Sequence, residues 1–526
     1  MEIIKKRIHM NYQKGKAEQT ITLDEDFNVP DSKPDIVKKI KEHGMVVLEK
    51  VRASDDKVII GGNLNFKFLY GTDEGCASME GKIPFEETVQ LQGTMPQDLI
   101  KCNYVLEDLS VHVIHSRKIS VKALITLTVK SDCISEKDLV CNLSSDKLQT
   151  LHHPMNVMKL GASKKDIFRI RESVTLPSDR ENIGNIVWYE LEPQSMDIRA
   201  CDGELSIKGE ISIFCIYESE QMGENAGDSN MKLNFYEDIV PYSGKIELSG
   251  CTEEMIPDVS VFVSEINLNA RPDDNGEMRI LEGELILELF MQAYAEETYD
   301  VLMDAYSPEH ELIMKKEDAS YESFLIKNNA KCHLNERFKM AESGILQIVH
   351  SSGDVHIEDV SSENGLMQVE GSVSVSVVYL KADDADRIGC AVYQIPFHTE
   401  MEINSDCTDC IYSAGPGYLQ IGAVLTGGGT VDIKCSVGVD IMVMVNHKDN
   451  VITEIEVKAP DMERIKNLPG LVGYITCEGD TLWDIAKKYC TTQEEIMKLN
   501  NLESSAVKPG MKLLLMKYCV CAPSGK

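Results

Sequence analysis

The stretch Gly473-Tyr-Ile-Thr-Cys-Glu-Gly-Asp-Thr-Leu-Trp-Asp-Ile-Ala-Lys-Lys-Tyr489 decides the fold of the C-terminal end of the chain. It opens with a short β-prone run, 474–477, which ends at Gly479. A helix should follow, capped by Asp480 or Thr481. Its apolar positions recur at i, i+3, i+4 and i+7 and are Leu482, Ile485, Ala486 and Tyr489. The pattern predicts a strand followed by a short amphipathic helix.

The residues that follow predict a second helix and a second strand. Thr492 and Glu495 have the spacing of a capping box, and Ile496 and Leu499 of that helix can face the first helix. Pro509-Gly510 is a turn signal, and residues 511–515 form a second β-prone run. The predicted order is β-α-α-β within residues 473–517.

This order, the Gly-Asp-Thr-Leu-Trp start, the Leu-Asn-Asn-Leu middle and the Lys-Pro-Gly-Met-Lys-Leu end closely resemble a LysM module. In that family, N-acetyl groups of glycans bind backbone amides of the loops that follow the first strand and precede the second. The resemblance implies a partner- or glycan-binding surface formed by Gly479, Asp480, Thr481, Leu482, Asn500, Leu502, Lys508, Pro509 and Gly510. For Asp480 and Thr481, helix capping is the favoured alternative, and for Leu482 it is core packing.

Trp483 and Lys487 complete the candidate site. Trp483 lies one residue off the apolar stripe, at its edge, and tryptophan is enriched at binding hot spots. The alternative is that its ring covers the core of the small module. Lys487 and three further lysines (Lys488, Lys508 and Lys512) place positive charge on an acidic protein. A basic face would suit an acidic partner, although a solvated lysine is the simpler interpretation of each.

Composition and charge exclude several classes of protein. The chain has 526 residues, with 53 Lys and Arg against 86 Asp and Glu, and a formal net charge of −33. Such acidity disfavours nucleic-acid binding, which requires basic residues to neutralise phosphates. The N-terminus shows no apolar signal region, and no run of 18 apolar residues occurs. We therefore expect no signal peptide and no transmembrane segment, and read most of the 16 scattered cysteines as reduced.

Upstream of the module, one strand-like pattern occurs three times, in 62–70, 209–217 and 371–379. Each copy begins with glycine, alternates polar with apolar residues and reaches tyrosine eight positions later. This alternation predicts a half-buried strand. A loop and a Pro-aromatic pair follow each copy, at Pro84-Phe85, Pro241-Tyr242 and Pro396-Phe397.

The repeat predicts a mainly β chain with three tandem β-rich domains, sandwich- or barrel-like, before the small βααβ module. The expected domains span 1–150, 165–300 and 328–457, with a linker at 458–472 and the module at 473–517. The segments 152–165 and 307–327 are polar and partly helical in pattern and are expected to connect the domains. A proline lies 32 residues before the glycine in the first two copies, as Pro30 and Pro177. The third copy is degenerate, with Lys339 at that spacing.

The segment Asp26-Phe-Asn-Val-Pro-Asp-Ser-Lys-Pro-Asp-Ile36, with the Gly-to-Tyr strand, resembles the SPOCS domain of clostridial spore proteins. Three such domains and one LysM module resemble the SipL-like family of spore-coat morphogenetic proteins. The resemblance implies a non-enzymatic assembly scaffold in the mother-cell cytoplasm, at the forespore surface. It also implies a protein partner, the SpoIVA-type coat ATPase, bound through the LysM module, with other coat proteins as further partners. The alternative is a protein that binds peptidoglycan or chitin-like oligomers of N-acetylglucosamine.

No motif predicts catalysis, a cofactor or a metal site. Gly427-Gly428-Gly429 lacks the Lys-Ser/Thr of a phosphate loop and is expected to form a turn. Cys407-x-x-Cys410 has no second ligand pair at a suitable distance, so a structural loop is favoured. Cys519 and Cys521 are expected to be an exposed, oxidisable tail. No enzyme is expected.

Overall fold

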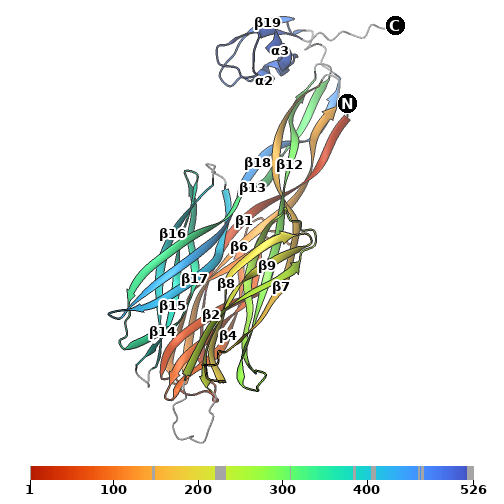
Figure 1. Ribbon diagram of the computed structural model, residues 1–526. Coiled ribbons are helices and arrows are strands. Elements are labelled where there is room, and N and C mark those ends of the chain that lie inside the picture. The colour runs from red at the N-terminus through yellow and green to blue at the C-terminus, as the bar shows by residue number, and fades with distance from the viewer. Residues whose placement is uncertain are drawn as a thin grey trace.

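The protein consists of three similar β repeats, a long stalk and a small C-terminal module (Figure 1). The computed structural model describes residues 2–144, 148–219, 233–307, 310–382, 387–403, 410–459, 463 and 467–517. The strands of the first repeat are β1 (Glu2–Asn28), β2 (Lys38–Ser54), β3 (Lys57–Thr72), β4 (Gly75–Gln90), β5 (Leu99–His115) and β6 (Lys118–Ser144). Those of the second are β7 (Gln149–Thr175), β8 (Ile183–Cys201), β9 (Glu204–Ser219), β10 (Leu233–Glu247), β11 (Ile256–Pro272) and β12 (Met278–Tyr306). Those of the third are β13 (Glu311–Lys339), β14 (Ile345–Glu363), β15 (Leu366–Lys381), β16 (Ile388–Glu402), β17 (Cys410–Thr426) and β18 (Thr430–Lys458).

Each repeat is a sandwich of two three-stranded antiparallel sheets. The first repeat pairs its strands in the orders β1-β6-β5 and β2-β3-β4, and the other two repeats follow the same scheme. Apolar side chains from both sheets form one core in each repeat. The expected mainly β fold class is confirmed. The glycine run at 427–429 forms the turn between β17 and β18, as predicted, with positive φ at Gly428 and Gly429.

The repeated glycine and the repeated Pro-aromatic pair lie opposite each other on neighbouring strands. Gly62 of β3 faces Phe85 of β4, and Gly209 faces Tyr242 in the second repeat. A Cβ on Gly62 would approach the Val47 carbonyl oxygen to 2.4 Å and the Phe85 ring to 2.9 Å. The aromatic ring therefore covers the bare glycine, a cross-strand pairing that only glycine permits. This contact explains why the two motifs recur together.

The strand that carries the glycine is more deeply buried than the half-buried strand that was predicted. In β3, Leu64 and Phe66 enter the core of the repeat, whereas Leu69 faces the other two repeats. Its equivalents in the other repeats, Ile216 and Val378, meet it there. The C-terminal half of the strand is thus buried on both faces, because three repeats pack together.

The segments expected to connect the repeats are strands, which corrects that expectation. Residues 152–165 belong to β7, and most of 307–327 belongs to β13. They extend beyond the sandwiches as two-stranded ribbons with β12 and β18, while β1 and β6 form a third ribbon. Polar side chains on the exposed face of each ribbon gave these segments their misleading pattern.

The three ribbons pack into the stalk seen in Figure 1. Its core contains Leu139, Val301 and Val451, one from each repeat, all at most 1% exposed. The next residue of each strand, Val140, Leu302 or Ile452, belongs to a second apolar layer. A register shift follows at the same point of all three ribbons. The stalk is therefore a product of the same threefold repeat.

The third repeat differs from the others at its proline turn. In the first repeat the Val29 amide donates to the Arg117 carbonyl, and the Arg117 guanidinium bonds the carbonyls of Val29 and Pro30. In the second repeat, Arg279 holds Leu176 and Pro177 in the same way.

In the third repeat the equivalent bond joins the Met340 amide to the carbonyl of Gly429, which has no side chain to act as a clamp. Met340 lies 31 residues before Gly371, against 33 for Val29 and Gly62. The equivalent of Pro30 is thus Ala341, and the predicted equivalence of Lys339 is wrong because this turn is two residues shorter.

A buried polar cluster lies where the three repeats meet. Lys41, Trp188 and His350 occupy equivalent positions, opposite Leu69, Ile216 and Val378 on the central strands. The Lys41 ammonium and the Trp188 indole N–H contact one Glu190 oxygen at 2.5 and 2.6 Å, and His350 Nε2 lies 3.3 Å from the other. Burial disfavours the charged forms, but Lys41 and His350 hold the pKa of Glu190 well below its ordinary value. The cluster joins all three repeats through one carboxylate.

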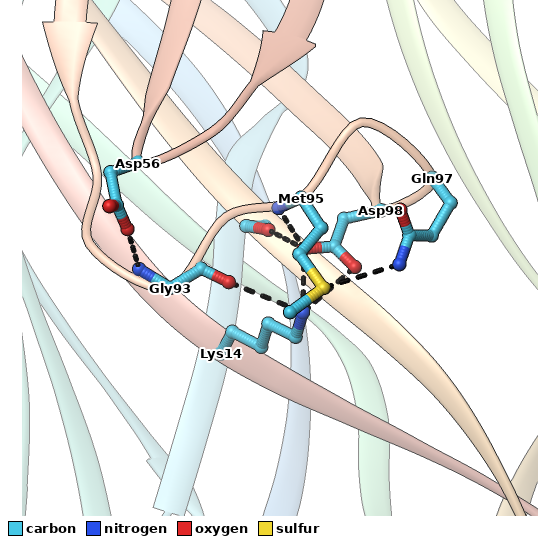
Figure 2. Close-up of polar contacts among 7 residues, drawn as sticks. Lys14, Asp56, Gly93, Met95, Gln97 and Asp98 are labelled. Carbon is cyan, nitrogen blue, oxygen red and sulfur yellow. Dashed lines mark hydrogen bonds and ion pairs between the residues drawn. The ribbon is translucent and has the colours of Figure 1, made fainter.

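The turn between β4 and β5 is fixed by a lysine of β1 (Figure 2). The Lys14 ammonium donates to the Gly93 carbonyl at 3.3 Å and to both Asp98 carboxylate oxygens at 2.9 and 2.8 Å. Asp56 accepts from the Gly93 amide, and Asp98 accepts from the Met95 amide. These bonds anchor the turn to the sandwich, beside a depression of about 760 Å³ between the first and third repeats.

Candidate binding module and its contact with the stalk

The C-terminal module has the predicted βααβ order and sits at the end of the stalk, beyond the three sandwiches (Figure 1). Its elements are β19 (Leu471–Ile475), α2 (Leu482–Lys488), α3 (Gln493–Asn500) and β20 (Lys512–Met516). β19 and β20 pair antiparallel. The two strands are joined by both helices, so the module has a core of its own, made mainly of α2, α3 and the inner face of the sheet.

Each helix is preceded by a threonine N-cap. Thr481 accepts from the Asp484 amide at 3.1 Å, and Thr492 accepts from the Glu495 amide at 3.1 Å. Of the two predicted caps for α2, Thr481 is therefore the residue used. Asp480 instead accepts from the Tyr474 hydroxyl and the Cys477 amide, both at 2.8 Å. It closes the turn that precedes the helix.

The inner faces of the helices follow the predicted periodicity with one exception. Leu482, Ile485 and Ile496 are at most 3% exposed. Leu499, expected to face the first helix, is 38% exposed. α3 packs against β20 through Asn500, whose side-chain oxygen accepts from the Leu514 amide at 2.7 Å and whose amide donates to the Leu514 carbonyl at 2.8 Å. This packing leaves Leu499 toward solvent.

The two candidate glycan-binding loops are adjacent and exposed. Thr476 joins them, because its carbonyl accepts from the Gly510 amide at 2.8 Å and its hydroxyl bonds the Lys508 carbonyl. Gly479 and Gly510 have φ of +88° and +82°, which strongly favours glycine. The exposed residues of these loops include Gly479, Thr481, Lys508, Pro509 and Gly510, whereas Asp480 and Leu502 are half-buried. The two loops implied by the family resemblance are thus adjacent and mostly exposed, whereas Leu482 is buried in the core and Asn500 is half-buried against Leu514.

Trp483 is buried against the stalk. Its side chain is 8% exposed, and its indole N–H donates to Asp304 of β12 at 2.7 Å. The Lys487 ammonium, one turn further along α2, lies 2.6 and 2.7 Å from the two oxygens of the same carboxylate. Partial burial opposes ionisation of Asp304, but the donors Lys487 and Trp483 outweigh it and lower its pKa. One carboxylate therefore receives donors from two side chains of α2.

Tyr306, two residues after Asp304, makes the second part of the contact. Its hydroxyl donates to the Thr491 carbonyl at 2.8 Å, and its ring meets the Trp483 ring edge-on at a centroid distance of 4.9 Å. Tyr306 is 7% exposed and belongs to the same apolar cluster as the core of the module. Burial raises the pKa of its hydroxyl. The last residues of β12 thus complete the module.

The outer face of the two-stranded sheet carries exposed apolar side chains, a surface that we call the outer strip. It consists of Leu471, Ile475, Leu514 and Met516, which are 40% to 60% exposed. Alternate residues of β19 and β20 point away from the helices, so this strip lies on the side opposite the core. Four large apolar side chains exposed together on one face of a small module are typical of a contact surface.

The sequence predicted the two loops but not the contact between the LysM-like module and the stalk. Asp304 and Tyr306 had no local signal, because their partners lie about 180 positions away. The outer strip could have been found from the alternation of Leu471, Gly473 and Ile475, since every second residue of a strand faces the same side.

Other groups with possible chemistry are sparse. Within the described ranges, no three His, Cys, Asp or Glu side chains gather to hold a metal ion. Twelve cysteines of the described part are free. Cys410 begins β17, whereas Cys407, Cys519 and Cys521 lie outside the described residues. Among the described helices, none is both long and apolar enough to cross a membrane.

Comparison with known families agrees with this architecture. Residues 35–114, 182–271 and 344–416 match the family described as SipL, SPOCS domain. Residues 474–515 match the LysM domain. No curated protein and no solved structure matches the chain. The chain is a protein of three tandem SPOCS domains and a C-terminal LysM domain, which are typically non-catalytic binding modules. It is a SipL-like sporulation protein.

Proposed function

We propose that the chain is a non-enzymatic scaffold of spore-coat assembly that docks a SpoIVA-type coat ATPase through its LysM domain. The placement of this domain is the main support for the proposal. It is fastened to the end of the stalk by Asp304 and Tyr306, away from the three sandwiches. A domain held in this way can reach a surface-bound partner while the SPOCS domains remain available for other coat proteins.

The outer strip is the part of the LysM domain best suited to a protein partner. Four apolar side chains lie together on it, with Lys512 paired opposite Ile475 at its edge. Protein interfaces combine an apolar centre with a polar rim. Lys508 and Lys512 add positive charge to a chain with a net charge of −33. The proposed partner surface is therefore apolar at its centre, with Lys512 at its edge.

Glycan binding is the second candidate. It is supported by the two exposed loops, which Thr476 holds next to each other. The backbone of residues 478–481 in one loop therefore lies beside that of 508–510 in the other. An oligomer of N-acetylglucosamine would bind there, as the LysM family implies. The strong acidity of the chain, by contrast, disfavours a nucleic-acid partner.

We propose that this activity takes place in the mother-cell cytoplasm, at the forespore surface; the SipL-like domain order supports this proposal. The partner there is a protein layer, whereas glycan binding would require access to cortex or wall.

Titration of the full chain with the two candidate ligands tests the proposal. A SpoIVA-type ATPase should give saturable binding, and oligomers of N-acetylglucosamine should give none or much weaker binding. Met516→Glu should weaken the protein interaction alone. Saturable binding of the glycan with no binding of the ATPase would contradict the proposed function and support the second candidate.

A further inference from the structure

The contact between the LysM domain and the stalk pairs complementary hydrogen-bonding groups, as a binding site and its ligand do. On the LysM side, Trp483 and Lys487 offer two donors, and the Thr491 carbonyl offers one acceptor. On the stalk side, the Asp304 carboxylate accepts from both donors, and the Tyr306 hydroxyl donates to the carbonyl. Residues i and i+2 of a strand point to the same side, so a short extended segment satisfies all three groups.

This pairing belongs to one repeat only. The register shifts of the three ribbons place Asn142 and Glu454 at the position of Asp304. Ser144 and Glu456 take the place of Tyr306. The end of β12 alone therefore combines a carboxylate with an aromatic hydroxyl two residues later. The segment is specific to the site it occupies and is not a general feature of the fold.

The connection between the stalk and the LysM domain does not impose this contact. Twelve residues, 459–470, join β18 to β19, and a chain of that length can span about 40 Å. The Lys487 side chain in the contact is 42% exposed and that of Asp304 is 21% exposed. Partly exposed ion pairs contribute little stability, so this pair alone does not hold the contact closed, and a competing segment that offers the same carboxylate and aromatic ring can replace it.

We propose that this face of α2 is a recognition surface for an extended aspartate-x-aromatic segment of the partner, and that Asp304-Ala-Tyr306 occupies it as a built-in ligand until the partner displaces it. The inference rests on the proposed function and adds to the outer strip a second contact, on α2, for which it specifies the partner chemistry. Asp304 then has two effects. It fastens the LysM domain to the stalk, and it competes with the partner for Trp483 and Lys487.

The test uses the full chain with ¹⁵N-labelled tryptophan, whose two indole signals report Trp188 and Trp483. The probe is the acetylated and amidated peptide Val-Leu-Met-Asp-Ala-Tyr-Ser, which copies residues 301–307. In Asp304→Ala, the peptide should bind at least tenfold more tightly than in the unaltered chain and shift the Trp483 signal. Asp304→Asn, which keeps the shape of the side chain, should show the same gain to a lesser extent.

Three controls sharpen the result. Asp300→Ala removes an exposed carboxylate of the same strand, which pairs with His152, and should leave peptide binding as weak as in the unaltered chain. Lys487→Ala added to Asp304→Ala should abolish the gain, as should the peptide with its aspartate replaced by alanine. Equal peptide binding to the unaltered chain and to Asp304→Ala, or no binding to either Asp304 variant, would overturn the inference.

Binding of the SpoIVA-type ATPase separates this inference from the proposed function. Relief of competition should tighten ATPase binding to Asp304→Ala by about threefold or more. Weaker ATPase binding would show that the contact presents the LysM domain and does not compete, which overturns the inference. If the ATPase binds neither chain while the peptide binds Asp304→Ala, the proposed function fails and the recognition surface stands.

Discussion

The indole nitrogen of Trp483 lies 2.7 Å from a carboxylate oxygen of Asp304, which is 179 positions earlier in the chain. This bond turns the edge of the LysM helix toward the stalk, where the ring is covered by Tyr306. It changes the interpretation of a residue that the sequence marks as a possible hot spot. Trp483 anchors the domain, and its ring is available to an external protein only after this contact opens.

Trp483→Ala should therefore destabilise the LysM domain as well as its contact with the stalk. Removing a buried tryptophan side chain costs about 3–5 kcal/mol, which is large for a domain of this size. Hydrogen exchange of the amides of α2 should accelerate strongly. Trp483→Phe keeps a ring against Tyr306 and loses one hydrogen bond, so its cost should be about 1 kcal/mol. Unchanged exchange in Trp483→Ala would show that the ring contributes nothing to the fold.

The polar cluster between the repeats should be sensitive to loss of one partner. Lys41→Met leaves the buried Glu190 carboxylate without its closest cation, and breaking a buried pair costs about 3–5 kcal/mol. Urea unfolding followed by fluorescence measures the change. Lys82→Met is the matched control, because Lys82 and its partner Glu49 are both more than half exposed. It should cost less than about 1 kcal/mol. Equal effects of the two variants would refute the role given to the cluster.

Stability should fall as the pH rises above neutrality. Burial disfavours the charged imidazole of His350, but its bonds to Glu190 and Glu237 raise its pKa from 6.5 to about 9. Its contribution is complete below pH 6.5 and is lost as the pH rises through about 9. Glu192 acts in the same direction, since burial and the charge of Glu190 raise its pKa to about 8.

The variant His350→Gln isolates the histidine. Thermal unfolding at a series of pH values between 6 and 9.5 should show a shallower loss of stability in the variant than in the unaltered chain. Parallel profiles would exclude His350 as a source of the pH dependence. The positive charge of His350 lowers the pKa of Glu192, so the difference between the two profiles includes a smaller change at Glu192 that follows from loss of the histidine.

The outer strip should be needed for partner binding and not for folding. Met516→Glu places a charge on a side chain that is 53% exposed, so the domain should stay folded. If the strip is the centre of the interface, binding of the ATPase should weaken roughly tenfold or more. Ile167→Glu, on a β7 side chain that is 57% exposed, is the control and should bind normally. Normal binding by Met516→Glu would remove the strip from the interface.

Local patterns predicted the LysM domain well, because its structure is set by short-range signals. The stripe that includes Leu482 and Ile485 gave α2, and Thr492 gave the start of α3. The Gly62-to-Tyr70 pattern likewise gave the central strand of each SPOCS domain. Where caps, turns and alternation act within a few residues, sequence alone was sufficient.

Contacts between repeats could not be predicted in this way. The ribbons of the stalk have polar outer faces, so 152–165 resembled a connector although it continues a strand. Lys41, Trp188 and His350 occupy equivalent positions only once the register of the strands is known. Asp304 had no sequence feature that links it to Trp483. Each of these features depends on packing between segments that are far apart in the chain.

Docking through the LysM domain is tested by comparing the full chain with a chain that ends at residue 459, after β18 and before the LysM domain. Both are titrated with the same SpoIVA-type ATPase, and thermal unfolding verifies that the three SPOCS domains remain folded in the shorter chain. If the LysM domain docks the partner, the shorter chain should lose saturable binding. Equal affinity of the two chains would show that the LysM domain does not dock the partner and would assign the interaction to the SPOCS domains.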